Sequence, residues 1–230
     1  IYWFESDGAA DPSFSATTIT SSADGIYSVY AKDLDNDGDM DIMSASANDD
    51  KIAWYESYIP GPTDVSGVIS SNTTWSAASS PYIVTGSVMV NEGVTLTIEA
   101  GVEVKFDADM VLLVNGELIA QGTDGNEITF TSNESSPAAG DWGPLTFNDS
   151  SVDATFDGDG NYSSGSILEY CIIEYGQGVY ISPASPFINH CIIRYNDDYP
   201  GIYGNPTSDV MIKITNNQFY NNLGGGLAVF

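Results

Sequence analysis

Short apolar runs, separated by glycine, asparagine and acidic residues, recur along most of the chain. None of them has a sustained 3.6-residue periodicity, so the pattern predicts many short strands and no long helix. Turns such as residues 99–101 and 115–116 separate the runs. The clearest expected strands are residues 82–84, 87–90, 95–98, 102–106, 111–114, 117–119, 128–130 and 145–147. The pattern therefore indicates an all-β protein.

One six-residue block returns in the C-terminal half of the chain. Residues 170–175 read YCIIEY and residues 190–195 read HCIIRY, an offset of 20 residues. A third copy, NNQFYNN, occupies residues 216–222. A period near 20 residues, with one buried strand and Asn or Gly corners, is typical of a coil of a parallel β-helix. A β-sandwich is the alternative, but antiparallel hairpins do not predict this return.

Successive coils stack about 4.8 Å apart, so equivalent residues should lie above one another. The expected pairs are Cys171 with Cys191, Ile173 with Ile193, Ile172 with Ile192, and Glu174 with Arg194. Because neighbouring side chains of a strand face opposite sides, the first two pairs should point inward and the last two outward. Parallel Cβ vectors at this spacing are too far apart for an unstrained disulfide, which favours a reduced, buried pair of thiols.

A longer echo marks the N-terminal region. Residues 1–6 (IYWFES) return as residues 52–57 (IAWYES), an offset of 51 residues, which is the size of a propeller blade or a similar β repeat. Two prolines at residues 60–62 cannot continue a ladder and predict a connector. The predicted domains are a β repeat over residues 1–59 (a partial unit and a full one), a linker over residues 60–66 and a β-helix over residues 67–230. The absence of an initiator Met suggests a processed or partial chain.

The first region also holds the strongest chemical motif. Five carboxylates fall within nine residues: Asp33, Asp35, Asp37, Asp39 and Asp41. The first three alternate, so a turning loop can aim them at one point, and Gly38 at the sixth position permits the bend. Asp39 is expected to offer its backbone carbonyl and Asp41 a further carboxylate. This set of hard oxygen ligands predicts Ca²⁺ as the cofactor, and the alternative is a solvated acidic turn.

The calcium motif departs from an EF-hand. Ser44 stands at the twelfth position in place of Glu, and no helices flank the loop. An affinity in the range of about 10⁻⁴–10⁻³ M, as in extracellular modules, is therefore expected. A second acidic stretch, residues 153–161, has fewer alternating carboxylates and is expected to be a loop without metal.

Two family resemblances rest on these residues. Residues 33–42 and 48–56 make the first region similar to an FG-GAP/VCBS repeat, the integrin-α-like propeller blade of many bacterial surface proteins. Residues 75–230, with blocks such as 94–102 and 114–122, resemble the right-handed parallel β-helix of the pectate-lyase-like superfamily. That superfamily includes lyases, hydrolases, adhesins and passive stalks, so this resemblance implies a fold more than a function.

The charge of the chain excludes several partners. It has 32 acidic residues against five basic ones, a net charge of −27. This charge repels phosphate backbones and anionic lipids, so neither nucleic acid nor a membrane surface is an expected partner. No apolar run approaches the ~18–20 residues of a membrane-spanning helix. An extracellular or cell-surface location is expected.

Catalytic groups are scarce. The resemblance to lyases implies an Arg or Lys base, yet the β-helix region offers only Lys105, Arg194 and Lys213. His190 is the single histidine and has no nucleophile at an interpretable spacing. Residues 197 and 198 are an acidic pair, but adjacent side chains of a strand diverge, so a loop is expected there. We therefore do not expect an enzyme.

The leading hypothesis is a calcium-stabilised, extracellular structural or adhesion module of a bacterial protein. Its expected partners are calcium, other domains of a longer chain, or identical subunits stacked into a filament. The alternative is a carbohydrate-binding or polysaccharide-degrading β-helix. A strip of tyrosines near one end could bind neutral sugars or could simply fill corners: Tyr175, Tyr180, Tyr195, Tyr199 and Tyr203.

Overall fold

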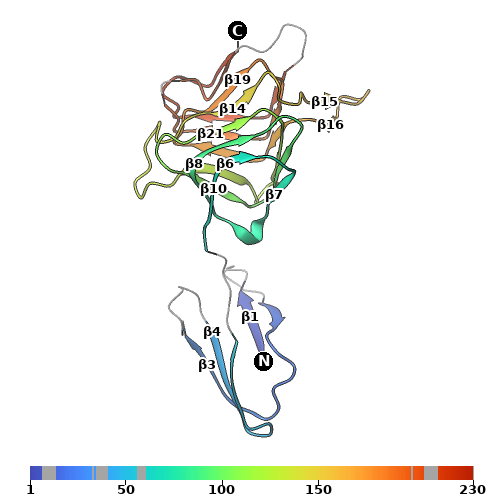
Figure 1. The fold of residues 1–230 in the computed structure, drawn as a ribbon, viewed down its shortest axis with the longest axis vertical. Coiled ribbons are helices and arrows are strands. Elements are labelled where there is room, and N and C mark those ends of the chain that lie inside the picture. The colour runs from blue at the N-terminus through green and yellow to red at the C-terminus, as the bar shows by residue number, and fades with distance from the viewer. Residues whose placement is uncertain are drawn as a thin grey trace. The chain divides into compact units, whose positions relative to one another are not determined.

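The computed structural model describes the chain as two compact units, Ile1–Ile59 and Pro60–Phe230. The described residues are 1–6, 14–32, 34, 41–55, 61–197, 199–204 and 212–229. Figure 1 shows strands throughout both units. Each unit is treated by itself below.

The first unit contains two antiparallel sheets. In one, β1 (Tyr2–Ser6) pairs with β2 (Phe14–Thr18). In the other, β4 (Asp41–Ser46) lies between β3 (Ile26–Lys32) and β5 (Lys51–Tyr55). The central strand β4 is largely buried, whereas β3 is exposed along its length. The two copies of the echoed hexapeptide thus contribute to β1 and β5.

The second unit is the expected right-handed parallel β-helix, in which each coil contributes strands to three faces (Figure 1). We call these faces sheets 1, 2 and 3. Sheet 1 contains β10 (Glu103–Phe106), β13 (Ile128–Ser132), β18 (Cys171–Glu174), β21 (Ile192–Arg194) and β24 (Gln218–Tyr220). Sheet 2 contains β11 (Leu112–Val114), β14 (Leu145–Asn148), β19 (Val179–Ser182), β22 (Ile202–Gly204) and β25 (Leu227–Val229). Sheet 3 contains β7 (Thr73–Trp75), β9 (Thr95–Ile98), β12 (Glu117–Gln121), β17 (Ile167–Glu169), β20 (Phe187–Asn189) and β23 (Lys213–Thr215).

Two strands run through the corner between sheets 1 and 2. The first part of β8 (Tyr82–Val90) pairs with β10 and its last part with β11, so the two runs expected separately form one strand. β6 (Thr63–Ile69) lies beside β8 along both parts and forms the first coil with β7. It begins inside the segment expected to be the linker, because its extended backbone can pair with β8 as soon as the prolines have passed. A short 3-10 helix, η1 (Ala77–Ser79), joins β7 to β8.

The core is a column of stacked side chains inside the coils. In sheet 1, Ile173 lies beside Phe130 on one side and Ile193 on the other, and Phe219 follows in the next coil. Cys171 and Cys191 are buried in the same column, as the 20-residue offset predicted. Each fully buried aliphatic or aromatic side chain contributes roughly 1.5–3 kcal/mol, so the helix is stabilised mainly by this column.

The sharp corners on either side of sheet 1 use left-handed backbone conformations. The residues with positive φ before sheet 1 are Tyr170, His190 and Asn216, and those after it are Tyr175, Tyr195 and Asn221. Asn adopts this conformation readily, whereas Tyr and His do so at a cost. The rings of the larger residues stack across coils: Tyr170 on His190 at 4.8 Å and Tyr175 on Tyr195 at 5.4 Å.

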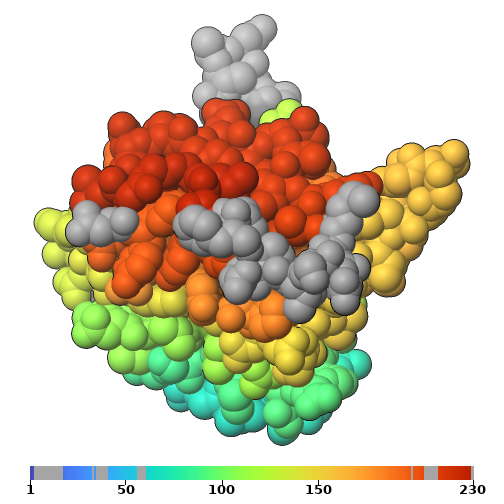
Figure 2. All heavy atoms as spheres, turned by 90° about the horizontal axis from the view of Figure 1, so that it is seen from above, coloured from blue at the N-terminus to red at the C-terminus, as the bar shows by residue number. Residues whose placement is uncertain are grey.

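One insertion projects from the side of the β-helix. It is the antiparallel hairpin of β15 (Thr155–Phe156) and β16 (Tyr162–Ser164), seen at the edge in Figures 1 and 2. Its base packs on the outer side of sheet 3, where the rings of Phe156 and Tyr162 contact Phe187. Lys213 of β23 secures it: its Nζ lies 3.7 Å from the Phe156 ring and donates to the Gly160 carbonyl at 3.0 Å. The hairpin therefore ties one coil to another two turns further on.

Candidate functional site

Of the five residues in the predicted calcium loop, the structure describes one. Asp41 begins β4 and is fully buried, and its carboxylate accepts a hydrogen bond of 3.0 Å from the Leu34 amide. Asp33, Asp35, Asp37 and Asp39 lie outside the described residues. Within the described ranges, no group of three or more His, Cys, Asp or Glu residues is arranged to hold a metal. A carboxylate at the end of a run of four more acids is a donor set that suits a hard cation, because such ions prefer oxygen ligands.

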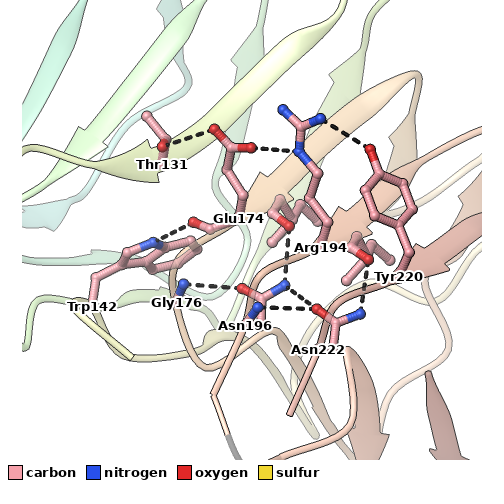
Figure 3. Close-up of polar contacts among 10 residues, drawn as sticks. Thr131, Trp142, Glu174, Gly176, Arg194, Asn196, Tyr220 and Asn222 are labelled. Atoms are coloured by element: carbon pink, nitrogen blue, oxygen red, sulfur yellow. Dashed lines mark hydrogen bonds and ion pairs between the residues drawn. The ribbon is translucent and has the colours of Figure 1, made fainter. Parts of the chain in front are cut away.

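Figure 3 shows a polar ladder on the outer side of sheet 1, contributed by four successive coils. The Thr131 hydroxyl donates to Glu174 Oε1 at 3.1 Å. Arg194 Nε donates to Glu174 Oε2 at 2.6 Å, and its Nη1 donates to the Tyr220 hydroxyl oxygen at 2.9 Å. The predicted neighbourhood of Glu174 and Arg194 is confirmed as an ion pair. The guanidinium is thus held by two protein groups.

This environment fixes the protonation state of Arg194. Burial by itself lowers the pKa of the guanidinium, but the hydrogen bonds with Tyr220 and Glu174 and the Glu174 charge outweigh it, so the pKa lies above its ordinary value. A group with so high a pKa carries its proton at every physiological pH and cannot accept another as a general base. The other two cations of the β-helix also have partners: Lys105 lies 3.1 Å from Glu103, and Lys213 holds the hairpin.

A second ladder runs beneath the first and consists of amide side chains (Figure 3). Asn196 is fully buried; its Oδ1 accepts from the Gly176 amide at 3.0 Å, and its Nδ2 donates to the Ile173 carbonyl at 3.1 Å. Asn222, one coil on, accepts from Asn196 and donates to the Ile193 carbonyl at 2.8 Å. The ladder satisfies backbone groups at a corner where strands end. The sequence analysis expected a loop at residues 197 and 198 and missed this role of Asn196, although the matching place of Asn222 after the next block was a usable signal.

Trp142 anchors the long connection between β13 and β14. Its ring is fully buried and stacks on Phe106 at 4.1 Å, while its Nε1 donates to the Glu174 carbonyl at 2.9 Å (Figure 3). It also covers Gly176, at which a Cβ atom would overlap the indole ring. The indole therefore fixes the corner below the Asn196 ladder, and nothing in the local sequence pattern predicted this.

A cluster of three tyrosines lies on the outer side of sheet 2. The rings of Tyr180 and Tyr203 belong to adjacent coils and lie 5.0 Å apart, and Tyr199 stacks on Tyr203 at 4.9 Å. Burial is the main cause that raises the pKa of Tyr203 to about 12, and the charges of the neighbouring phenols of Tyr199 and Tyr180 add to this effect. Its phenol is thus a neutral hydrogen-bonding group at physiological pH.

The two cysteines and the histidine do not form a reactive group. Cys171 and Cys191 are free and buried, and the Cys191 thiol donates to the carbonyls of Leu168 and Asn189 at 3.4 Å. Burial raises the pKa of the Cys171 thiol well above its ordinary value, with Cys191 adding to the effect. His190 instead lies exposed at a corner and stacks on Tyr170.

The second acidic stretch forms the tip of the hairpin. The Asp157 carboxylate accepts hydrogen bonds from the amides of Asp159 and Asn161 and from Asn161 Nδ2, at 3.0, 2.8 and 3.1 Å. The side-chain bond from Asn161 is the main cause of the lowered pKa of Asp157. These bonds make its carboxylate part of the turn itself.

Comparison with known proteins gives two matches to family models. Residues 67–185 match the pectate-lyase-like beta helix domain, and residues 1–44 match the FG-GAP-like repeat. Searches among curated proteins and among solved structures find no match. Both domain types are typical of extracellular proteins. Among the described residues, none forms a helix with the length and hydropathy that a bilayer crossing requires. The chain belongs to the pectate-lyase-like beta helix family and carries an FG-GAP-like repeat ahead of that domain.

Proposed function

We propose that the chain is a calcium-stabilised extracellular module with a structural or adhesive role. The observation that carries the structural part is the state of the three cations in the β-helix. Lys105 and Arg194 are ion-paired on sheet 1, and Lys213 holds the hairpin. A lyase needs a basic group that can accept a proton from the substrate, and each of these three residues already contacts a protein acceptor.

Calcium belongs to the same proposal. In this proposal the ion is bound by the carboxylates of Asp33, Asp35, Asp37 and Asp41 and by the backbone carbonyl of Asp39. The bound ion neutralises the run of like charges before β4. Calorimetric titration should give a dissociation constant of about 10⁻⁴–10⁻³ M. Asp37→Asn should weaken calcium binding, whereas Asp157→Asn at the hairpin tip should leave it unchanged. Equal thermal stability of the first unit in calcium and in chelator would count against this role.

Neighbouring domains or identical subunits are the proposed structural partners. In the described part of the chain, β6 and β24 each have a paired edge on one side only. Open strand edges can accept further coils or another subunit. Sedimentation at increasing concentration, with electron microscopy, tests whether copies stack. A monomer at all concentrations would remove self-association from the proposal without affecting the calcium site.

Polysaccharide cleavage is the second candidate, and the family match favours it in that the fold often carries such activity. Incubation with polygalacturonate or alginate, followed by ultraviolet absorbance of unsaturated products, tests it directly. We expect no absorbance change. Turnover that Arg194→Ala abolished would replace the structural role with a catalytic one.

A further inference from the structure

One aromatic cluster on the outer side of sheet 2 contributes no side-chain hydrogen bond to the described part of the fold. We call Tyr180, Tyr199 and Tyr203 the tyrosine platform. Tyr180 and Tyr203 point outward at the same position of successive sheet 2 strands, and Tyr199 is added from the preceding connection. Tyr199 is 50% exposed. Clustered, exposed tyrosines are typical of binding surfaces, since each supplies much contact area at a small cost in side-chain entropy.

The hydroxyl groups of the platform are available. None of the three donates or accepts a hydrogen bond within the described residues. Tyr162 and Tyr220 differ, because their hydroxyls bond to the Gly165 carbonyl and to Arg194. The raised pKa of Tyr203 keeps that phenol neutral. The platform therefore combines apolar ring surface with neutral hydrogen-bonding groups at its outer edge.

Charge selects the class of ligand. The strands of sheet 2 contain no Asp, Glu, Lys or Arg. The chain as a whole carries a charge of −27, so anionic polymers such as nucleic acids and polyuronates are repelled. An uncharged polymer with apolar C–H faces and hydroxyl groups at its edges matches both properties of the platform.

The stacking of the rings adds pre-organisation. Tyr203 lies between contacts to Tyr180 at 5.0 Å and to Tyr199 at 4.9 Å, so its ring is ordered before any ligand arrives. A ligand that contacts ordered side chains loses less free energy to conformational restriction. From the exposure of Tyr199, the free hydroxyls and the uncharged strands of sheet 2, we infer that the tyrosine platform binds an uncharged polysaccharide. This inference rests on the adhesive role proposed above and names its target.

The test uses the full chain and insoluble cellulose and chitin as uncharged probes, with alginate beads as an anionic comparison. Wild-type protein should be retained by at least one uncharged polysaccharide and not by alginate. Tyr199→Ala should weaken retention about tenfold or more, because it removes the exposed ring of the platform. Tyr203→Phe keeps the ring and removes only the hydroxyl, so it should weaken retention less than Tyr199→Ala. Tyr27→Ala removes an 88% exposed tyrosine of the first unit and should change nothing.

Four results would overturn the inference. The first is that neither uncharged probe retains the wild type, and the second is that Tyr199→Ala is retained as well as the wild type. The third is that Tyr27→Ala loses as much retention as Tyr199→Ala. The fourth is that only collagen-coated beads retain the protein and Tyr199→Ala abolishes that retention. The last result would assign the platform to a protein partner. Repeating the assay in chelator separates this inference from the calcium site: platform binding should persist when calcium is removed, and calcium binding should persist in Tyr199→Ala.

Discussion

Replacing Asn196 with alanine tests whether the buried amide ladder stabilises the β-helix. The substitution removes the acceptor of the Gly176 amide and the donor to the Ile173 carbonyl, both of which are in buried residues. Asn222 stays bonded, because its Oδ1 also accepts from the main-chain amide of residue 196 at 3.0 Å and its Nδ2 still donates to the Ile193 carbonyl. Two buried groups therefore lose partners, at about 1–3 kcal/mol each. The free energy of unfolding should fall by about 4 kcal/mol.

Urea unfolding followed by far-ultraviolet circular dichroism measures this loss. For a domain of this size, the same change lowers the thermal midpoint by about 8–16 °C. Asn91→Ala is the matched control, because Asn91 is exposed and its side chain has no hydrogen bond in the described structure; it should change stability by less than about 0.5 kcal/mol. Adding Asn222→Ala to Asn196→Ala should cost less than the sum of the two single changes, since the residues share bonds. A loss below about 1 kcal/mol for Asn196→Ala, or an equal loss for Asn91→Ala, would refute the reasoning.

Three further predictions concern other contacts. Gly176→Ala places a Cβ atom against Trp142 and should cost about 1–3 kcal/mol in urea unfolding, whereas Gly158→Ala, with open space around it, should cost far less. Because the pKa of Cys171 is raised in the folded protein, this thiol ionises at lower pH in the unfolded chain. The free energy of unfolding should therefore be constant below the ordinary thiol pKa of about 9 and fall above it, by at most about 1.4 kcal/mol per pH unit. In Cys171→Ala, the free energy of unfolding should fall less between about pH 7 and 10. Lys213→Met removes the hairpin's hydrogen bond and cation–π contact, so limited proteolysis should cut the hairpin faster than in wild type, and an unchanged rate would show that the lysine does not hold it.

The regular part of the β-helix could be predicted because stacking repeats a local pattern. The offset between Cys171 and Cys191 places equivalent residues in register, and alternation along the strand then decides which face the core. The same rule gave the Glu174–Arg194 pair, since both residues follow the buried isoleucine by one position. Pairings that depend on one repeat length are thus readable from sequence.

The contacts that escaped prediction depend on irregular segments. Trp142 reaches Phe106 and Gly176 only because a long connection returns to the corner, and no periodicity encodes that path. Asn196 resembles any polar loop residue until the corner around it is closed by the next coil. The first residues of β6 lie within the segment expected to be the linker, because β6 has few apolar residues and is recognised only through its pairing with β8.

The parallel pairing of successive coils determines how the β-helix responds to mechanical tension. Its inter-strand hydrogen bonds point along the helix axis, so a load in that direction opens them one coil after another instead of all at once. The coil from Cys171 to Cys191 contains 20 residues (191 − 171) and occupies one strand spacing of about 4.8 Å when folded. Fully extended, it spans about 65–70 Å. The extended length of one coil is therefore more than ten times the length that it occupies when folded, so a stacked β-helix extends under tension in separate steps of one coil each.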